Sequence, residues 1–144
     1  MFTVQPYLNF DGKAEEAFNF YKSVFGGEFS MMQRFNEIPA SPDMPPIPEE
    51  EGKRIMHVAL PIGNGGMLMA SDTMPSMGHT LTEGNNFYVS LHPDNKEEAD
   101  RLFKGLSEGG TVKMPMTDMF WGAYYGDFKD KFGIQWMINC QEKK

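Results

Sequence analysis

The chain has 144 residues, 40% of them hydrophobic and 23% charged, and a formal net charge of -7. This length and composition fit one compact domain, and the acidic balance argues against a nucleic-acid partner because phosphate contacts need a basic surface. The single cysteine, Cys140, excludes an internal disulfide and a zinc site made of several cysteines. No run approaches about 18 apolar residues, so no membrane partner is expected. The N-terminus lacks the features of a signal peptide, and we expect a cytoplasmic protein.

The predicted elements repeat along the chain. The segment that starts at Leu8 resembles the segment that starts at Leu91, at an offset of 83 residues. Each contains an apolar stripe spaced i, i+3, i+4, i+7, which is typical of a helix with one buried face. The two stripes align at an offset of 82, which we interpret as a slip of one residue within the helix. They are Ala17, Phe20, Tyr21 and Val24 in the first copy and Ala99, Leu102, Phe103 and Leu106 in the second.

Each half continues with three strands, so its predicted order is strand, helix, strand, strand, strand. In the first half we predict strands over 3–10, 28–36, 53–61 and 67–72, and a helix over 13–25. In the second half we predict strands over 86–92, 111–117, 122–128 and 133–139, and a helix over 96–108. We expect Asp11 and Asp94 to be the N-caps of the helices, because short carboxylates accept from the first free amides.

The third and fourth strands of each half align at an offset of 67 instead of 83, so the first half carries 83 minus 67, or 16, extra residues. They fit the segment 36–51, which contains five prolines and four glutamates. Such a composition predicts an exposed loop with no helix or inner strand, and such a loop is a candidate lid or dimer arm. The resulting plan is module one over 1–75, a linker over 76–84 and module two over 85–144.

Alternation along the strands gives each predicted sheet a polar and aromatic face away from its helix. Gln5 and Tyr7 lie on this face in the first strand, and Tyr88 lies on it in the fifth. Two curved sheets with such faces would enclose a cleft, the usual location of a small-molecule site. We therefore expect a small organic ligand bound between the two modules.

The third strand places His57 on the same side, and the offset of 67 aligns it with Tyr124. A histidine in a cleft can donate a hydrogen bond to a ligand or exchange a proton as a catalytic acid or base. A structural histidine bonded to a backbone carbonyl is the alternative. Asp72, at the end of the fourth strand, is a candidate to orient a ligand beside it.

Five aromatic side chains gather between Phe120 and Phe128, and Trp121 and Tyr124 among them are candidates to line the cleft. Aromatic rings with a hydroxyl or indole group suit a flat or apolar organic ligand. The alternative is that these rings belong to the core or to a dimer surface.

Several segments resemble the PhnB-like branch of the vicinal oxygen chelate superfamily, which contains glyoxalase I, bleomycin-resistance proteins and extradiol dioxygenases. These segments are "PYLNFDGKAEEAFNFYKSVFGGE", "IMHVALPIG", "LMASD" and "FWGAYYGDFKDKFGIQWMIN". The resemblance implies an α+β fold in which two βαβββ modules form curved mixed sheets around a cleft. It also implies a homodimer. Some relatives carry a demethylubiquinone methyltransferase label, which no glycine-rich nucleotide-binding junction in this chain supports.

The metal-dependent members of that superfamily take two ligands from the first strand and two from the last strand of the modules. The resemblance carries these positions onto Gln5, Tyr88, Ala70 and Met137. Zinc and hard divalent ions need histidine or carboxylate ligands here, which these residues do not supply. We therefore expect no glyoxalase-type metal site and no cofactor.

Three functions remain open at the level of sequence. The first is a small-molecule binding protein, as in the bleomycin-resistance members, which act by binding without chemistry. The second is a lyase, isomerase or transferase in which His57 acts as acid or base. The third is an interaction module that uses the proline-rich loop 36–51 as its contact.

Overall fold

The computed structural model describes residues 1–39, 42–43 and 45–141. The chain forms two compact units, Met1–Thr82 and Glu83–Lys144. The division between them falls within the segment that the sequence predicts as a linker. Residues 40, 41 and 44 of the predicted inserted loop, and residues 142–144 of the predicted second module, lie outside the described residues.

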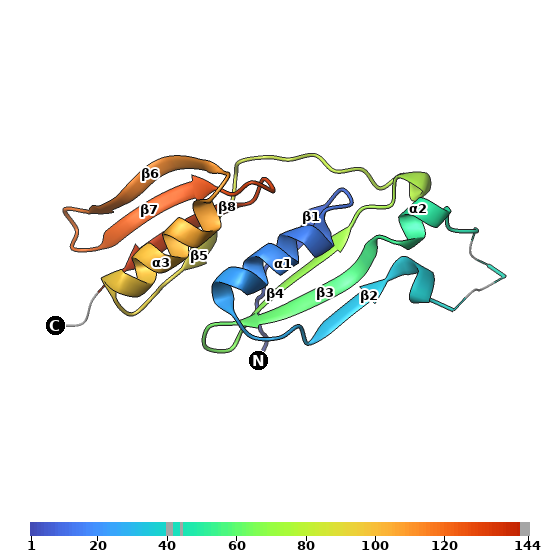
Figure 1. The fold of residues 1–144 in the computed structure, drawn as a ribbon, viewed down its shortest axis with the longest axis horizontal. Coiled ribbons are helices and arrows are strands. Elements are labelled where there is room, and N and C mark those ends of the chain that lie inside the picture. The colour runs from blue at the N-terminus through green and yellow to red at the C-terminus, as the bar shows by residue number, and fades with distance from the viewer. Residues whose placement is uncertain (40–41, 44, 142–144) are drawn as a thin grey trace. The chain divides into compact units, whose positions relative to one another are not determined.

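The first unit contains a four-stranded mixed sheet with the strand order β1-β4-β3-β2 (Figure 1). Strand β1 runs parallel to β4, and the other neighbours are antiparallel. The main elements are β1 (Tyr7–Phe10), α1 (Ala14–Phe25), β2 (Met31–Arg34), β3 (Ile55–Ile62) and β4 (Gly66–Asp72). Three short helices accompany them, namely η1 (Phe35–Glu37), α2 (Glu49–Gly52) and η2 (Pro75–Met77).

The second unit repeats this plan with the strand order β5-β8-β7-β6. Strand β5 is parallel to β8, and the remaining pairs are antiparallel. Its elements are β5 (Val89–Leu91), α3 (Lys96–Ser107), β6 (Thr111–Asp118), β7 (Tyr124–Lys129) and β8 (Gln135–Cys140). The predicted α+β class and the βαβββ order of both halves are confirmed.

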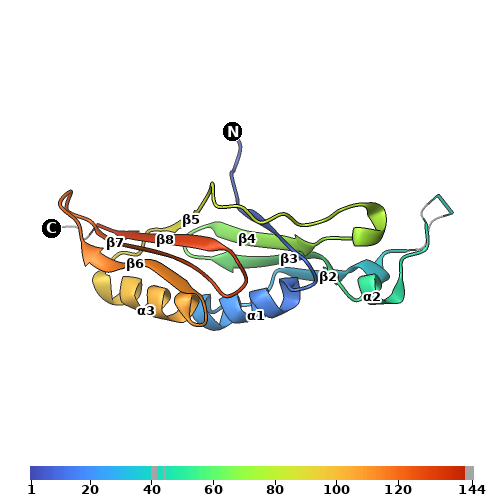
Figure 2. The same ribbon diagram turned by 90° about the horizontal axis from the view of Figure 1, so that it is seen from above.

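In each unit the core lies between the helix and one face of the sheet. Figure 2 shows α1 lying along one face of the first sheet. The buried residues there are Leu8, Phe10, Val58, Leu60, Leu68 and Ala70 from the strands and Ala14, Ala17, Phe18 and Tyr21 from α1. The second core contains Phe128, Trp136 and Ile138 from the strands and Ala99, Leu102 and Leu106 from α3. Burial of this apolar surface is the main favourable term that fixes each helix on its sheet.

The helices begin differently from the sequence prediction. Asn95 caps α3 and accepts a hydrogen bond from the Glu98 amide at 2.8 Å, so the expected cap Asp94 lies one residue too early. Lys13 occupies the cap position of α1 and its side chain makes no cap bond. The carboxylate of Asp72 from β4 accepts from the Ala14 amide at 2.9 Å instead. The predicted cap Asp11 forms an ion pair with Arg54.

One error in the predicted repeat changes the face of several strand residues. Tyr7 lies opposite Met69, and Ser90, 83 residues after Tyr7, lies opposite Met137. The last strands are therefore related by 137 minus 69, or 68 residues, and not by 67. Because side chains alternate, this single residue moves Ala70 to the buried side of its sheet and gives His57 the partner Tyr125 in place of Tyr124.

The strands that start each half are shorter than predicted. Val4 is 82% exposed and Phe87 is 57% exposed, and both lie outside the observed strands β1 and β5 although the predicted strands included them. Ile55 is 1% exposed, although strict alternation would place it on the same face as His57, because the ladder between β2 and β3 shifts beside it. The inserted segment also forms the short helix α2, which the proline content had excluded. The helix α2 begins at Glu49, directly after Pro48, so no proline lies inside it, and the three glutamates of its first turn interact favourably with the helix dipole.

Candidate functional site

The first sheet presents a face of mixed polar and apolar side chains on the side opposite α1. We call it the open face of the first sheet, and it is formed by Tyr7, Asn9, Met31, Gln33, His57, Met69 and Ser71. These residues alternate along their strands with the core residues that face α1. The alternation therefore brings a phenol, an imidazole, two amides and two thioethers onto one surface.

Tyr7 and His57 form the best-defined contact on this face. The Tyr7 hydroxyl lies 3.1 Å from His57 Nδ1, and the two rings stack with centroids 5.7 Å apart and an interplanar angle of 26°. Tyr7 is 46% exposed and His57 is half-buried, so both remain accessible. The structure brings together two of the side chains that the sequence predicted for the ligand site.

Gln5 lies just before β1 and helps to close the edge of the sheet. Its Oε1 accepts a hydrogen bond from the Met67 amide at 3.0 Å. The side chain thus takes the place of the backbone carbonyl that a longer β1 would offer to β4. This contact occupies the amide oxygen that the sequence assigned to a ligand.

Asp72 lies on the other side of the same sheet, beneath α1. It is 3% exposed, and its second carboxylate oxygen accepts from the Ile55 amide at 2.8 Å, in addition to the bond from Ala14. A cavity of about 320 Å³ borders this carboxylate, but its arginines already contact carboxylates, Arg34 with Glu15 and Arg54 with Asp11. The hydrogen bond from Arg54 lowers the pKa of Asp11. The geometry gives Asp72 a structural role in joining α1, β3 and β4.

The remaining predicted site residues belong to the second unit and do not share one location. Tyr124 faces α3, where its hydroxyl donates to Asp100 at 2.7 Å and its ring lies 5.1 Å from the Lys96 ammonium. The hydrogen bond to Asp100 raises the pKa of Tyr124 to about 12. The prediction that Tyr124 points away from the helix is wrong, because the predicted alignment of the last strands of the two halves was off by one residue.

Tyr88 and Trp121 contact other residues than Tyr124 does. The Tyr88 hydroxyl accepts from the Lys113 ammonium at 3.3 Å. Trp121 is 50% exposed and contacts Phe120 and Tyr125 with edge-to-face geometry, at centroid distances of 5.1 and 6.3 Å. Tyr125, which the sequence did not select, lies on the side of the second sheet opposite α3, where the sequence had placed Tyr124.

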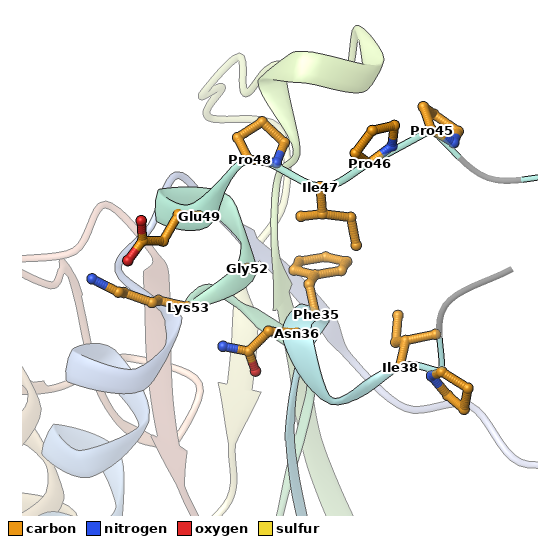
Figure 3. Close-up of a pocket in the computed structure, with 11 residues that line it drawn as sticks. Phe35, Asn36, Ile38, Pro45, Pro46, Ile47, Pro48, Glu49, Gly52 and Lys53 are labelled. Carbon is orange, nitrogen blue, oxygen red and sulfur yellow. The ribbon is translucent and has the colours of Figure 1, made fainter. Parts of the chain in front are cut away.

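A second cavity, of about 390 Å³, lies within the inserted segment between β2 and β3 (Figure 3). Figure 3 shows the Phe35 ring and the Ile47 side chain facing one another, with Asn36 and Lys53 on the other side of Phe35. The lining consists of Phe35, Asn36, Ile38, Pro39, Pro45, Pro46, Ile47, Pro48, Glu49, Gly52 and Lys53. This cavity is largely apolar, and no pair of hydrogen-bonded catalytic groups lines it among the described residues.

The side chains at the four positions implied by the metal-dependent relatives do not fit a metal centre. Ala70 is fully buried on the helix side and has no donor atom, and the Gln5 oxygen is occupied by the Met67 amide. The Lys113 ammonium lies beside the Tyr88 hydroxyl, which disfavours a second cation there. Within the described parts of the chain, no three His, Cys, Asp or Glu side chains gather in a way that could hold a metal ion.

Comparison with known proteins identifies the family. The model of the glyoxalase/bleomycin resistance protein/dioxygenase superfamily matches residues 4–138. The chain belongs to this superfamily. Protein YjdN from Escherichia coli K12, another relative of the chain, is 32% identical over 98% of this chain and 97% of its own length.

Solved structures of similar proteins support the same assignment within the superfamily. Protein PA1353 from Pseudomonas aeruginosa is 38% identical, with a TM-score of 0.84 over 99% of this chain and 100% of that one. The PhnB protein from Bacillus cereus is 27% identical, with a TM-score of 0.73 over 96% of this chain and 99% of that one. The resemblance to the PhnB-like branch is thereby confirmed. Among the described residues, no helix combines the length and apolar character needed to cross a bilayer.

Proposed function

We propose that this superfamily member binds a small, partly apolar organic molecule on the open face of the first sheet, without a glyoxalase-type metal site. The observation that carries the proposal is the contact between Tyr7 and His57, in which two accessible rings stack and their polar atoms lie 3.1 Å apart. Such a contact fixes both rings before a ligand arrives, which reduces the entropy lost on binding.

The hydrogen bond between the rings determines what His57 offers to a ligand. When the Tyr7 hydroxyl donates to Nδ1, the neutral imidazole carries its proton on Nε2 and can donate from there. Among the described residues, no side chain or backbone group makes a hydrogen bond to Nε2. The thioethers of Met31 and Met69 lie on the same face and supply adaptable apolar surface around this donor.

The absence of metal ligands at the four carried-over positions supports binding without metal chemistry. The bleomycin-resistance members that the chain resembles offer a precedent for this mode of action. The proposal predicts a ligand with one hydrogen-bond acceptor directed at His57 and an apolar or aromatic body.

Methyl NMR of the protein labelled at its methionines can test this proposal, because Met31, Met67 and Met69 report on the first sheet. Quinoline is a suitable probe, since it is flat and has one acceptor nitrogen. We expect quinoline to shift these methyl signals, and we expect Tyr7→Phe and His57→Gln each to weaken its binding about threefold or more, through loss of one hydrogen bond.

The matched control is Tyr124→Phe, which removes a hydroxyl from the second unit and should leave quinoline binding unchanged. If quinoline perturbs only methyl groups outside the first sheet, or if Tyr7→Phe and His57→Gln bind it like the wild type, the proposed site is wrong.

A second candidate function is a lyase, isomerase or transferase reaction in which His57 moves a proton. The free Nε2 atom favours it, because a proton could pass between this atom and a bound molecule while Tyr7 holds Nδ1. Turnover of a bound compound that disappears in His57→Gln, while Tyr7→Phe retains part of it, would favour this function over binding alone.

We also propose that the protein acts as a homodimer. Strands β1 and β2 form the edges of the first sheet, and β5 and β6 form those of the second. Such edges carry backbone groups that a second copy can cover.

A further inference from the structure

A lysine in the second unit donates hydrogen bonds to two neutral side chains and has no carboxylate partner among the described residues. Lys113 lies on β6, and its ammonium donates to Gln135 Oε1 and, at 3.3 Å, to the Tyr88 hydroxyl. Among the residues that the structure describes, no carboxylate oxygen lies within 4.0 Å of this ammonium. Lys129 on the neighbouring strand, in contrast, lies 4.0 Å from Glu83.

The position of the Lys113 ammonium depends on a buried amide. Gln135 is 3% exposed, and its Nε2 donates to the Phe87 carbonyl at 2.6 Å. Because a side-chain amide has one donor group and one acceptor atom, this bond leaves Oε1 to accept from Lys113. The backbone at Phe87 therefore orients Gln135, and Gln135 in turn holds the lysine.

One aromatic ring, that of Tyr88, lies beside this cation on the side of the second sheet opposite α3. The ammonium lies 5.2 Å from the centroid of the Tyr88 ring. Tyr125 lies on the same side, and its hydroxyl donates to Asp127 Oδ2 at 2.8 Å. The one carboxylate that β7 contributes to this side is therefore engaged by a neutral hydroxyl and not by Lys113.

We propose that Lys113 binds the carboxylate of a planar aromatic ligand on this side of the second sheet. An ammonium has three donors, of which Gln135 and Tyr88 take two, so the third is free for an anion. One point charge matches a monoanionic carboxylate, whereas phosphate recognition commonly draws on bidentate arginine or several donors. This inference goes beyond the proposed function, which rests on Tyr7 and His57 in the first unit, so each can fail without the other.

The test compares 2-naphthoate with its neutral analogue 2-naphthamide in methyl NMR titrations of the full chain. Met137 lies on the same side of the second sheet and reports on this site, while Met69 reports on the first sheet. We expect naphthoate to shift the Met137 methyl signal and to bind about tenfold more tightly there than naphthamide, as a charge-assisted hydrogen bond should provide. Lys113→Met should remove this preference, and Lys113→Arg should retain part of it.

The control is Lys104→Met on α3, which changes the net charge of the chain by the same amount. Naphthoate binding should be unchanged in this variant, with the wild-type preference for the carboxylate. The proposal is overturned if Met137 does not respond to naphthoate, if Lys113→Met keeps the preference, or if Lys104→Met loses it to the same extent. Displacement of naphthoate by inorganic phosphate at concentrations where acetate has no effect would overturn the assignment to a carboxylate.

Discussion

At the scale of single residues, Asp72 shows how the same side chain can suit two roles. A carboxylate at the end of a strand beside His57 is a reasonable candidate for ligand binding in the sequence. In the structure both of its oxygens accept from buried backbone amides, those of Ala14 and Ile55. The sequence could not reveal this role, because it depends on where the first turn of α1 meets the end of β4.

Asp72→Ala should lower the free energy of unfolding by about 1–3 kcal/mol, because it leaves two buried amides without acceptors. Urea denaturation followed by circular dichroism measures this change. Asn9→Ala, at an exposed position of the same sheet, serves as the control and should have a much smaller effect. If Asp72→Ala keeps the wild-type stability but loses quinoline binding, the structural role is wrong and Asp72 belongs to the ligand site.

Tyr125 gives a prediction for high pH. Burial, together with its hydrogen bond to Asp127, raises the pKa of Tyr125 to about 12. The folded state thus favours the neutral phenol, so this contribution to stability is complete below the ordinary tyrosine pKa of about 10 and is lost as the pH rises through about 12.

Carbon-13 NMR of labelled tyrosines should show the Tyr125 ring titrating well above the range of an exposed tyrosine. Tyr125→Phe should remove that signal and reduce the loss of stability between about pH 10 and about pH 12. Titration of Tyr125 near pH 10 would show that the hydroxyl is neither buried nor bonded to Asp127 as described.

At the scale of elements, the start of α3 tests the described backbone most simply. Asp94 and Asn95 are both good capping residues, so residue type alone could not choose between them. The choice is made by the backbone, which is extended at Asn95 and helical from Lys96 onward.

Asn95→Ala should therefore cost about 1 kcal/mol in the free energy of unfolding, through loss of the bond to the Glu98 amide. Asp94→Ala is the matched control one residue earlier, and chemical denaturation should find it less destabilising. If Asp94→Ala lowers the free energy of unfolding more than Asn95→Ala does, the helix starts at the position predicted from the sequence.

The strands show most clearly what the sequence could and could not provide. Helix faces were predictable because a stripe of period 3.6 tolerates an error of one position, and Ala99, Leu102 and Leu106 are indeed buried. A strand has period 2, so one residue of misalignment reverses every side chain. The offset of 67 between the last strands of the two halves introduced that error, which misplaced Ala70 and Tyr124 but left Tyr7 and His57 on the correct face.

At the scale of the whole molecule, the doubled βαβββ plan was readable from the repeat because both halves kept the apolar pattern of the same elements. The network of Lys113, Gln135 and Tyr88 was not readable, since it joins residues from three separate segments and a backbone carbonyl at Phe87. The cavity between Phe35 and Lys53 was also missed, because prolines predict an exposed loop but not how that loop folds on itself.

The central claim is that this superfamily member binds an organic molecule through Tyr7 and His57 without a resident metal ion. Native mass spectrometry of the protein purified from rich medium without chelator tests it most directly. The account predicts a dimer that carries no stoichiometric divalent metal and retains an organic molecule that is lost from the Tyr7→Ala/His57→Ala double variant. One tightly held metal ion per chain, or an organic molecule retained equally by the double variant, would contradict it.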